Sequence, residues 1–289
     1  MSLLTPTVTS KTSLVRGASL ASAGLFALAL AACQSSTGMG GPEAGIDPAT
    51  ASPTNIASLS DVVGQNPTDA SAYNVRGTAF GRAGKYQDAM ADFNKAIQLN
   101  PNFYQAYANR ALVERRLKQD QQALADYNTA LQINPNYSDA YVGRANLYRS
   151  QGQVDLALAD LTKAVQLEPN DPKGYYNRAL IYQSQNRHDD AISDLTAATT
   201  YAPNQIDPYL SRGLSYLAIG DYKAALDDFN IAVRKDKQSY LGWTYQGLAL
   251  EKLGEPGKAH DAFARAQIIN PNYAPARDGM RRTAPQQGT

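Results

Sequence analysis

Large, small and polar side chains recur in the same order every 34 residues between positions 70 and 273. The fourth place of each 34-residue repeat is aromatic: Tyr73, Tyr107, Tyr141, Tyr175, Tyr209 and Trp243. The eighth place is small: Gly77, Ala111, Ala145, Ala179, Gly213 and Gly247. Because residues four apart lie on one face of a helix, this pattern predicts a first helix, A, in every repeat.

The later places of each repeat predict a second helix, B. Place 20 is alanine: Ala89, Ala123, Ala157, Ala191, Ala225 and Ala259. Place 24 is large and apolar: Phe93, Tyr127, Leu161, Leu195, Phe229 and Phe263. Place 27 is again alanine, from Ala96 to Ala266. Large side chains facing small ones let helix A dock closely on the helix B of its own repeat.

Proline marks the end of helix B, because it lacks the amide hydrogen and clashes with the preceding turn. Pro101, Pro135, Pro169 and Pro203 stand at place 32 of the first four repeats. In the fifth repeat this place holds Lys237. We expect a solvated turn there, and a looser or differently angled junction is the alternative.

Together these positions resemble the tetratricopeptide repeat (TPR) family over residues 70–273. The resemblance implies an all-α fold, a right-handed superhelical solenoid of helix-turn-helix repeats. The six expected repeats are 70–103, 104–137, 138–171, 172–205, 206–239 and 240–273. In such a stack each repeat leaves an apolar face that only its neighbour covers, so the ends need caps. We expect an N-terminal capping helix within residues 55–69 and a C-terminal cap and tail over residues 274–289.

Place 7 holds arginine and place 23 holds aspartate in the first five repeats. The arginines are Arg76, Arg110, Arg144, Arg178 and Arg212, and the aspartates are Asp92, Asp126, Asp160, Asp194 and Asp228. In the sixth repeat both change together, to Gln246 and Ala262. The joint change predicts ion pairs between helices A and B, either within a repeat or across to the next. The alternative is a ladder of arginines that faces a ligand.

The first 54 residues have a different composition. Lys11 and Arg16 precede an apolar run over residues 18–32, which is the layout of a secretory signal peptide, 1–32. Leu30-Ala31-Ala32-Cys33 resembles the lipobox of bacterial lipoproteins, which implies lipidation of Cys33. Ordinary secretion with an incidental cysteine is the alternative. Residues 33–54 are predicted to form the lipidated cysteine and a flexible tether.

The resemblance also implies a location. The residue after Cys33 is Gln34 rather than the aspartate associated with inner-membrane retention, so we expect a bacterial outer-membrane lipoprotein that faces the periplasm. The sequence holds 27 basic and 26 acidic residues, a balance that gives no indication of nucleic-acid binding. The membrane is expected to be contacted through the lipid anchor.

Enzymatic chemistry finds little support in the sequence. The only histidines are His188 and His260, both at places that are usually exposed in the family, and Cys33 has no second cysteine to form a metal site. No phosphate-binding loop, metal-ligand cluster or nucleophile motif is present. We therefore expect a non-enzyme without catalytic residues, metal or cofactor.

In TPR proteins the concave groove is lined by helix A, and the resemblance assigns a groove to this chain. Its first half is polar and basic: Asn74, Arg82, Asn109, Arg115, Arg116, Asn146 and Arg149. Its second half is apolar and aromatic: Tyr176, Asn177, Leu180, Leu210, Leu214, Leu217, Tyr245 and Leu248. We expect it to bind a peptide. For the apolar half, burial against a folded-back tail or a second copy, which would form a homodimer, is the alternative.

The combined resemblance implies a lipid-anchored periplasmic scaffold that binds other proteins or peptides of the bacterial envelope, such as peptidoglycan hydrolases or a protease. A pilot lipoprotein for pilus or secretin assembly is the second interpretation. A hydrolase accessory protein with weak activity of its own is the third.

Overall fold

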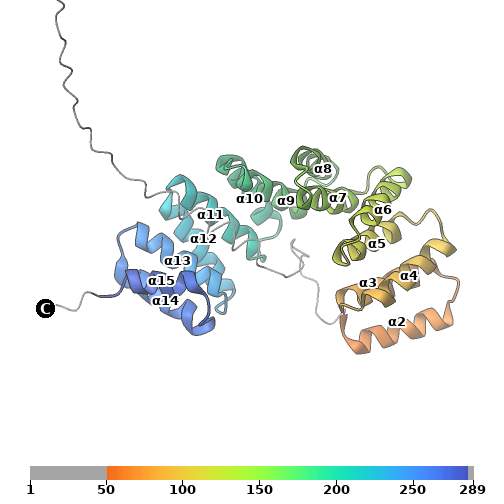
Figure 1. Ribbon diagram of the computed structural model, residues 1–289, viewed down its shortest axis with the longest axis horizontal. Helices are drawn as coiled ribbons and strands as arrows, with labels where there is room; N and C mark the ends of the chain where they lie inside the picture. Colours follow the sequence, from red (N-terminus) through yellow and green to blue (C-terminus); the bar gives the residue numbers. More distant parts are fainter. Residues whose placement is uncertain (1–50, 286–289) are drawn as a thin grey trace, which may run out of the picture. The chain divides into compact units, whose positions relative to one another are not determined.

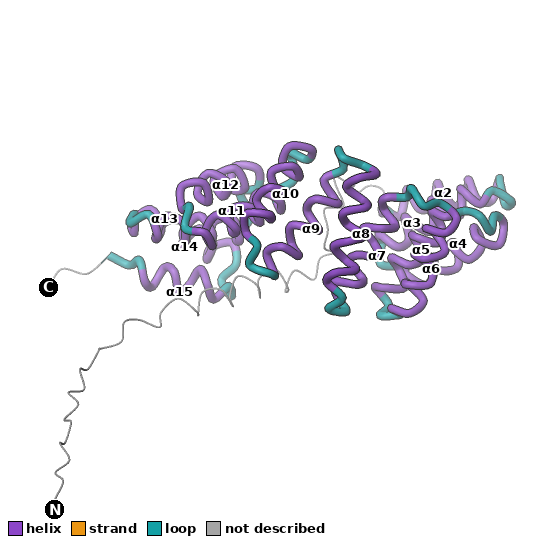
Figure 2. The backbone as a smooth tube through the Cα atoms, turned by 90° about the horizontal axis from the view of Figure 1, so that it is seen from above, coloured by secondary structure: helices purple, strands orange, loops and turns teal. Residues whose placement is uncertain are grey.

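The computed structural model describes residues 51–285, which form fourteen α-helices, α2 to α15. Within this part of the chain the secondary structure consists of helices and the turns that join them (Figure 2). From α3 to α14 the helices form consecutive pairs that recur about every 34 residues, so the predicted all-α stack of helix pairs is confirmed. The proposed signal peptide, Cys33 and nearly all of the tether lie outside the described residues.

Helices A and B alternate through the six repeats. The A helices are α3 (Ala70–Arg82), α5 (Tyr104–Arg116), α7 (Ser138–Ser150), α9 (Pro172–Ser184), α11 (Asp207–Ile219) and α13 (Tyr240–Lys252). The B helices are α4 (Tyr86–Leu99), α6 (Asp120–Ile133), α8 (Val154–Leu167), α10 (His188–Tyr201), α12 (Tyr222–Lys235) and α14 (Pro256–Ile269).

One further helix stands at each end of the stack. Helix α2 (Pro53–Gln65) packs on α3, and α15 (Ala274–Arg282) packs on α13 and α14 (Figure 1). Helix α2 begins at Pro53, where the Ser52 side chain accepts a hydrogen bond from the Asn55 amide. The tether was expected to reach residue 54, and this limit is wrong by two residues because Ser52 and Pro53 together start the helix.

Close approach of helices A and B within a repeat depends on the small residue at place 8. A Cβ atom built on Gly77 would lie 2.8 Å from the ring of Phe93, and one built on Gly213 would lie 2.5 Å from Phe229. The alanines at places 20 and 27 are fully buried in the same interfaces. The predicted fit of large residues against small ones is therefore what sets the spacing within each pair.

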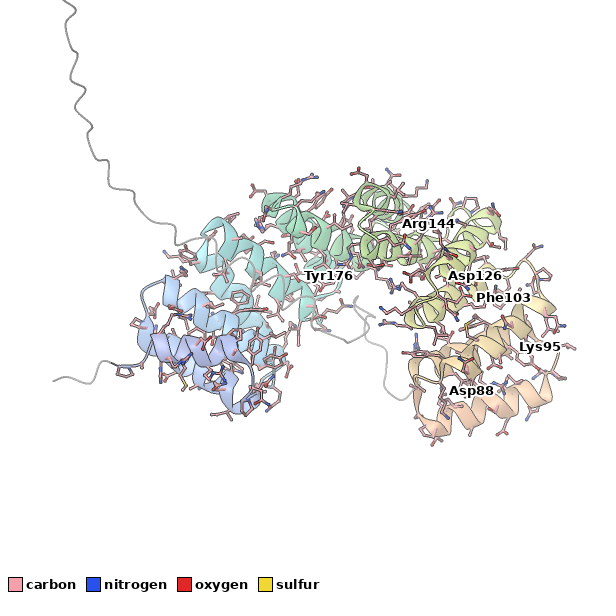
Figure 3. The ribbon with its side chains drawn as sticks, in the orientation of Figure 1. Asp88, Lys95, Phe103, Asp126, Arg144 and Tyr176 are labelled. Atoms are coloured by element: carbon pink, nitrogen blue, oxygen red, sulfur yellow. The ribbon has the colours of Figure 1, made fainter. Side chains whose placement is uncertain are left out.

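Each A helix contacts the next A helix in the chain as well as its own B helix. The A helices consequently form one continuous surface from α3 to α13, which we call the A-helix face. Figure 3 marks Tyr176 on α9, an A helix, and Lys95 on α4, a B helix. This face is where the sequence predicts the groove.

The turn from helix A to helix B places one residue in the left-handed backbone region in every repeat. These residues are Gly84, Lys118, Gly152, Asn186, Gly220 and Gly254, all at place 15. Glycine adopts this conformation without steric cost, whereas a lysine such as Lys118 does so at a cost. The turn is thus retained even where the residue is unsuited to it.

Candidate functional site

Five arginine–aspartate pairs join helices A and B in repeats one to five. In each pair Nε donates to Oδ2 and Nη2 donates to Oδ1, with distances between 2.6 and 2.9 Å. The pairs are Arg76–Asp92, Arg110–Asp126, Arg144–Asp160, Arg178–Asp194 and Arg212–Asp228. The predicted pairing is confirmed, and the partner is the aspartate of the same repeat.

The five pairs stabilise the fold rather than face solvent, because both partners are largely buried. The aspartates are buried, and the arginines are about four-fifths buried. The hydrogen bonds that Arg144 donates to Asp160 raise the pKa of its guanidinium, although burial acts in the opposite direction. Because each of the five guanidinium groups is committed to a carboxylate, the alternative of a ligand-facing arginine ladder is wrong.

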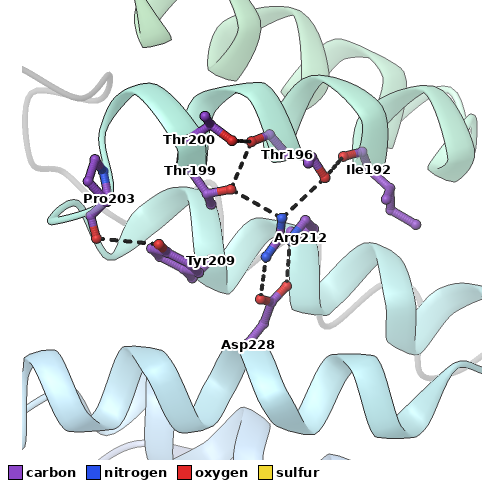
Figure 4. Close-up of polar contacts among 8 residues, drawn as sticks. All are labelled: Ile192, Thr196, Thr199, Thr200, Pro203, Tyr209, Arg212 and Asp228. Carbon is purple, nitrogen blue, oxygen red and sulfur yellow. Dashed lines mark hydrogen bonds and ion pairs between the residues drawn. The ribbon is translucent and has the colours of Figure 1, made fainter.

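The remaining nitrogen of the guanidinium links each repeat to the one before it. Nη1 of Arg144 donates to Asn128 at 2.7 Å, and Nη1 of Arg212 donates to Thr196 and Thr199 at 3.1 Å (Figure 4). The acceptor stands at place 25 of the preceding repeat in each case. For Arg110, Arg144, Arg178, Arg212 and Gln246 in turn, the acceptors are Asn94, Asn128, Thr162, Thr196 and Asn230. These polar residues stand 34 positions apart in the sequence, so the link between repeats could have been predicted from this period.

The aromatic residue at place 4 contacts both the arginine of its own repeat and the end of the preceding repeat. Each arginine lies over the tyrosine of its own repeat, with 5.5 to 5.8 Å from Cζ to the ring centroid. The hydroxyl of Tyr141 donates to the carbonyl of Pro135, and Trp243 donates from Nε1 to the carbonyl of Lys237 at 3.0 Å. The fifth junction therefore keeps the same contact with lysine in place of proline, as expected for a turn of the ordinary form.

The polar half of the predicted groove lies at least partly accessible on the A-helix face. Asn109 donates from Nδ2 to Oδ1 of Asn74 at 3.0 Å, which joins α5 to α3. Arg82, Arg115 and Arg116 are half-buried at the ends of the same two helices, and Arg149 is exposed at the end of α7, where Nη2 contacts Asn146. Basic side chains and amides thus come together over the first three repeats.

Three residues assigned to the apolar half are buried, and their assignment to an accessible groove is wrong. Leu210 and Tyr245 belong to the core between repeats five and six, where the Tyr245 ring lies 5.6 Å from that of Phe229. Asn177 is 2% exposed and donates from Nδ2 to the Lys173 carbonyl of its own helix. Leu210 and Tyr245, at places 5 and 6, pack into the core that repeats five and six share, a difference from the family pattern that the sequence did not predict.

The accessible remainder of the apolar half comprises Tyr176, Leu180, Leu214, Leu217 and Leu248, all half-buried. The last three also pack against the core cluster of repeats five and six, so part of their surface is already covered. A mixed surface results, with its apolar area concentrated on α9 and α11.

The A-helix face contains polar contacts that the sequence did not predict. Lys173 on α9 donates to Asp139 on α7 at 2.7 Å, and Gln183 donates to the Ser211 carbonyl and the Ser215 hydroxyl. Both contacts join consecutive A helices. The face is therefore fixed by side-chain bonds between repeats as well as by packing.

Glu114 is a buried carboxyl group on α5. Its side chain is 7% exposed, and its Oε1 lies 4.0 Å from Nε of Arg110. Burial, reinforced by the charge of Asp126, raises the pKa of Glu114 to about 7. Its position, place 11, holds Phe80, Tyr148, Tyr182, Tyr216 and Leu250 in the other repeats.

The histidines were expected to be exposed, and both are in fact partly buried. His260 contacts the Met280 carbonyl through Nδ1 at 3.1 Å, and burial lowers the pKa of His188. Residues 51–285 contain no group of three or more histidine, cysteine, aspartate or glutamate residues arranged to hold a metal ion. Among the helices of the same segment, none has the length and hydropathy needed to cross a membrane.

The sequence was also compared with models of known protein families. Family models of the tetratricopeptide repeat match residues 70–103, 104–137, 126–159, 145–186, 172–205 and 210–274. Three of these matches coincide with expected repeats, and together they leave only four residues of 70–274 unmatched. Among curated proteins, no sequence matches the chain.

Solved structures with the same fold come from proteins of low sequence identity. A chain of the APC/C hetero-tetramer Cut9–Hcn1 is 19% identical with a TM-score of 0.69, and the match covers 82% of this chain but 47% of that one. PilF of Pseudomonas aeruginosa is 16% identical with a TM-score of 0.67, over 76% of this chain and 99% of that one. PilW, described as a widely conserved type IV pilus biogenesis factor, is 16% identical with a TM-score of 0.65, over 72% and 97%. The present chain thus spans about half the length of the first of these.

Proposed function

The chain belongs to the tetratricopeptide repeat family of generally non-enzymatic protein-binding scaffolds, and we propose that it is a lipid-anchored adaptor of the bacterial envelope. Its lipobox, short tether and repeat type resemble those of NlpI, which scaffolds peptidoglycan hydrolases and a periplasmic protease. In this proposal Cys33 carries the anchor, the outer membrane is the site of attachment, and the repeats bind envelope proteins from the periplasmic side.

The A-helix face is the proposed binding surface, and one observation carries this choice. Four arginines, Arg82, Arg115, Arg116 and Arg149, come together on this face over the first three repeats, in addition to the place-7 arginines that pair with aspartates. Asp139 on α7 pairs with Lys173 on α9. The expected ligand is an extended peptide with a carboxylate for the arginines and an apolar side chain for Tyr176 and Leu180.

The binding surface is tested with paired substitutions. Arg115→Ala with Arg149→Ala should weaken partner binding, and the loss should shrink as salt is raised because exposed charge contacts are screened. The control is Lys95→Ala with Lys163→Ala, which removes the same charge from two B helices. Equal binding by both double variants would rule out the A-helix face.

The anchor is tested by Cys33→Ser. The variant should leave the membrane fraction or accumulate as an uncleaved precursor, because no thiol remains for acylation. Normal processing together with retention in detergent-soluble membranes would overturn the lipid anchor. The repeats fold independently of this result, so the adaptor proposal would survive it.

Pilus or secretin assembly is a second candidate. It is supported by the likeness of fold to PilF and PilW, whose chains are covered almost completely. Purification of the tagged protein from detergent-solubilised envelope separates the candidates. Co-purified cell-wall hydrolases or proteases favour the first, and secretin or pilus subunits favour the second.

A further inference from the structure

A hollow of about 440 Å³ is lined by residues of α12, α13 and α14 and of the turn that joins α12 to α13. These helices belong to the C-terminal part of the stack (Figure 1). It is lined by three cationic side chains, Arg234, Lys237 and Arg265, and by an apolar set that includes Trp243 and Ile268. None of these residues belongs to the proposed groove. The hollow is therefore a second surface, distinct from the A-helix face.

Three of its lining residues depart from the pattern that the chain follows elsewhere. Place 32 is Lys237 here, although it is proline in every other repeat. Place 4 is Trp243 here and tyrosine in the other five. Place 29 is Ile268 here and glutamine in the first three repeats. Because the other repeats fold with proline at place 32, tyrosine at place 4 and a polar residue at place 29, the repeat architecture does not require this combination.

The side chains of the hollow are poorly satisfied by the protein itself. Ile268 is 81% exposed, more than any other large hydrophobic residue recorded as exposed between residues 51 and 285. Arg265 lies over the Trp243 ring at 4.7 Å, a cation–π contact that leaves its hydrogen-bonding edge available. Within the described residues no ion pair engages Arg234, Lys237 or Arg265.

We propose that this hollow binds an acidic peptide segment of a partner protein, one that places a carboxylate beside a large apolar side chain. The carboxylate would meet the guanidinium groups of Arg234 and Arg265, which suit it geometrically. The apolar side chain would cover Trp243 and Ile268, and aromatic and arginine residues are the types that concentrate binding energy at interfaces. The size of the hollow falls in the range of small binding pockets and fits one or two side chains, a shape that a flat lipid surface would leave unfilled.

The chain carries its own reporter for this site, since Trp243 is its only tryptophan. The full-length protein is first used to select binders from a displayed library of random linear peptides. Peptides rich in aspartate or glutamate beside leucine, isoleucine or phenylalanine are expected. Each should change the Trp243 emission on binding, and Arg265→Gln should weaken it by about tenfold or more.

The matched control returns the site to the pattern of the other repeats. Lys237→Pro, Trp243→Tyr and Ile268→Gln together should leave the melting temperature unchanged or raised, while binding of labelled peptide, followed by anisotropy, is lost. Proline fits at position 237 because Asp236 has φ −133° and ψ 101°, close to the φ −139° and ψ 94° of Asn100 before Pro101. Loss of binding without loss of folding supports a site, since a merely structural role would lower stability.

Three outcomes overturn the proposal. The first is no enrichment of acidic–apolar peptides. The second is enriched peptides whose affinity is the same for the wild type, Arg265→Gln and the reverted variant. The third is binding to vesicles of phosphatidylglycerol and phosphatidylcholine that depends on these residues while peptides do not bind, which would assign the hollow to a membrane surface. Peptides selected by the A-helix face lose affinity in Arg115→Ala with Arg149→Ala and keep it in Arg265→Gln, so each enriched peptide is assigned to one surface by these two variants, and the second outcome requires that no enriched peptide depends on Arg265.

Discussion

Repeats two and six have the same backbone but distribute charge in opposite ways. Between α5 and α6, repeat two holds the Arg110–Asp126 pair and the buried Glu114. Between α13 and α14, repeat six has Gln246, Ala262 and Leu250 at the corresponding places, and its cation Arg265 lies outside, over Trp243. Both repeats pack through the same small and large residues, Ala111 against Tyr127 and Gly247 against Phe263.

The comparison shows that the fold does not need an internal ion pair. Gln246 keeps the link to the preceding repeat through Asn230, at 2.7 Å, without a charge. What the pair adds in repeat two is a dependence on its partners, because a buried charge that loses its counter-charge is strongly destabilising. The two repeats should therefore respond very differently to equivalent substitutions.

The largest expected effect is that of Arg110→Ala. It leaves the buried Asp126 without its partner and brings Glu114 beside an uncompensated carboxylate, so we expect a loss of about 2–4 kcal/mol in the free energy of unfolding. Arg144→Ala should cost less because repeat three has Tyr148 in place of Glu114. Gln246→Ala should cost about 1 kcal/mol or less, the net value of one neutral hydrogen bond. Urea denaturation of the three variants gives the order.

A double-mutant cycle checks the partner. Coupling between Arg144 and Asp160 should be large, whereas Arg144 with Asp126 of the neighbouring repeat should be close to additive. Equal coupling to both aspartates would contradict the pairing within a repeat.

The next effect tests whether repeat six can be converted. Ala262→Asp should destabilise the protein by about 1–3 kcal/mol, because position 262 is 3% exposed and the carboxylate would be unpaired. Adding Gln246→Arg should recover a large part of this loss by forming the pair found in the other repeats. No recovery in the double variant would show that the α13–α14 interface has diverged beyond place 7 and place 23.

Glu114 makes stability pH-dependent in repeat two. Its folded-state pKa of about 7 lies above the ordinary value of 4.5, so the folded state binds the proton more tightly than the unfolded state. The contribution of Glu114 to the free energy of unfolding is therefore most favourable at or below pH 4.5 and is lost as pH rises toward 7. Glu114→Gln should therefore flatten this decline and stabilise the protein at pH 8 by about 1–2 kcal/mol. Unfolding free energies of both proteins across this range test it, and parallel curves would contradict it.

The sequence predicts most of the fold because the aromatic, small and large apolar positions recur in all six repeats. Place 4, place 8 and place 24 fixed the helix pairs, and the joint change at Gln246 and Ala262 identified the arginine–aspartate pairing. It left open whether Arg144 meets Asp160 or Asp126, because both aspartates recur with the same period. That choice depends on the rotation of helix A against its two neighbouring B helices, which periodicity does not encode.

The site was less predictable for a related reason. Leu210, Tyr245 and Asn177 are buried, whereas Tyr176, which shares place 5 with Leu210, is half-buried, so the exposure of places 5 and 6 differs from one repeat to another. The family pattern assigns the same places to the groove in every repeat and so does not predict this variation. The hollow beside Trp243 depends on three departures from the repeat, and only the structure brings them together.

The smallest expected effect concerns the turn, where repeat two has Lys118 and repeat six has Gly254. Lys118 has φ 63°, so Lys118→Gly should relieve the steric cost of the left-handed backbone and stabilise the protein by about 0.5–1 kcal/mol, after the added entropy of glycine in the unfolded chain. Asn186→Gly should gain less, because asparagine tolerates this region. The converse substitution in repeat six, Gly254→Lys, should lose a comparable amount, since Gly254 has φ 77°. Thermal unfolding of the three variants measures these differences. A loss from Lys118→Gly would mean that the lysine side chain stabilises the turn by more than its backbone strain costs.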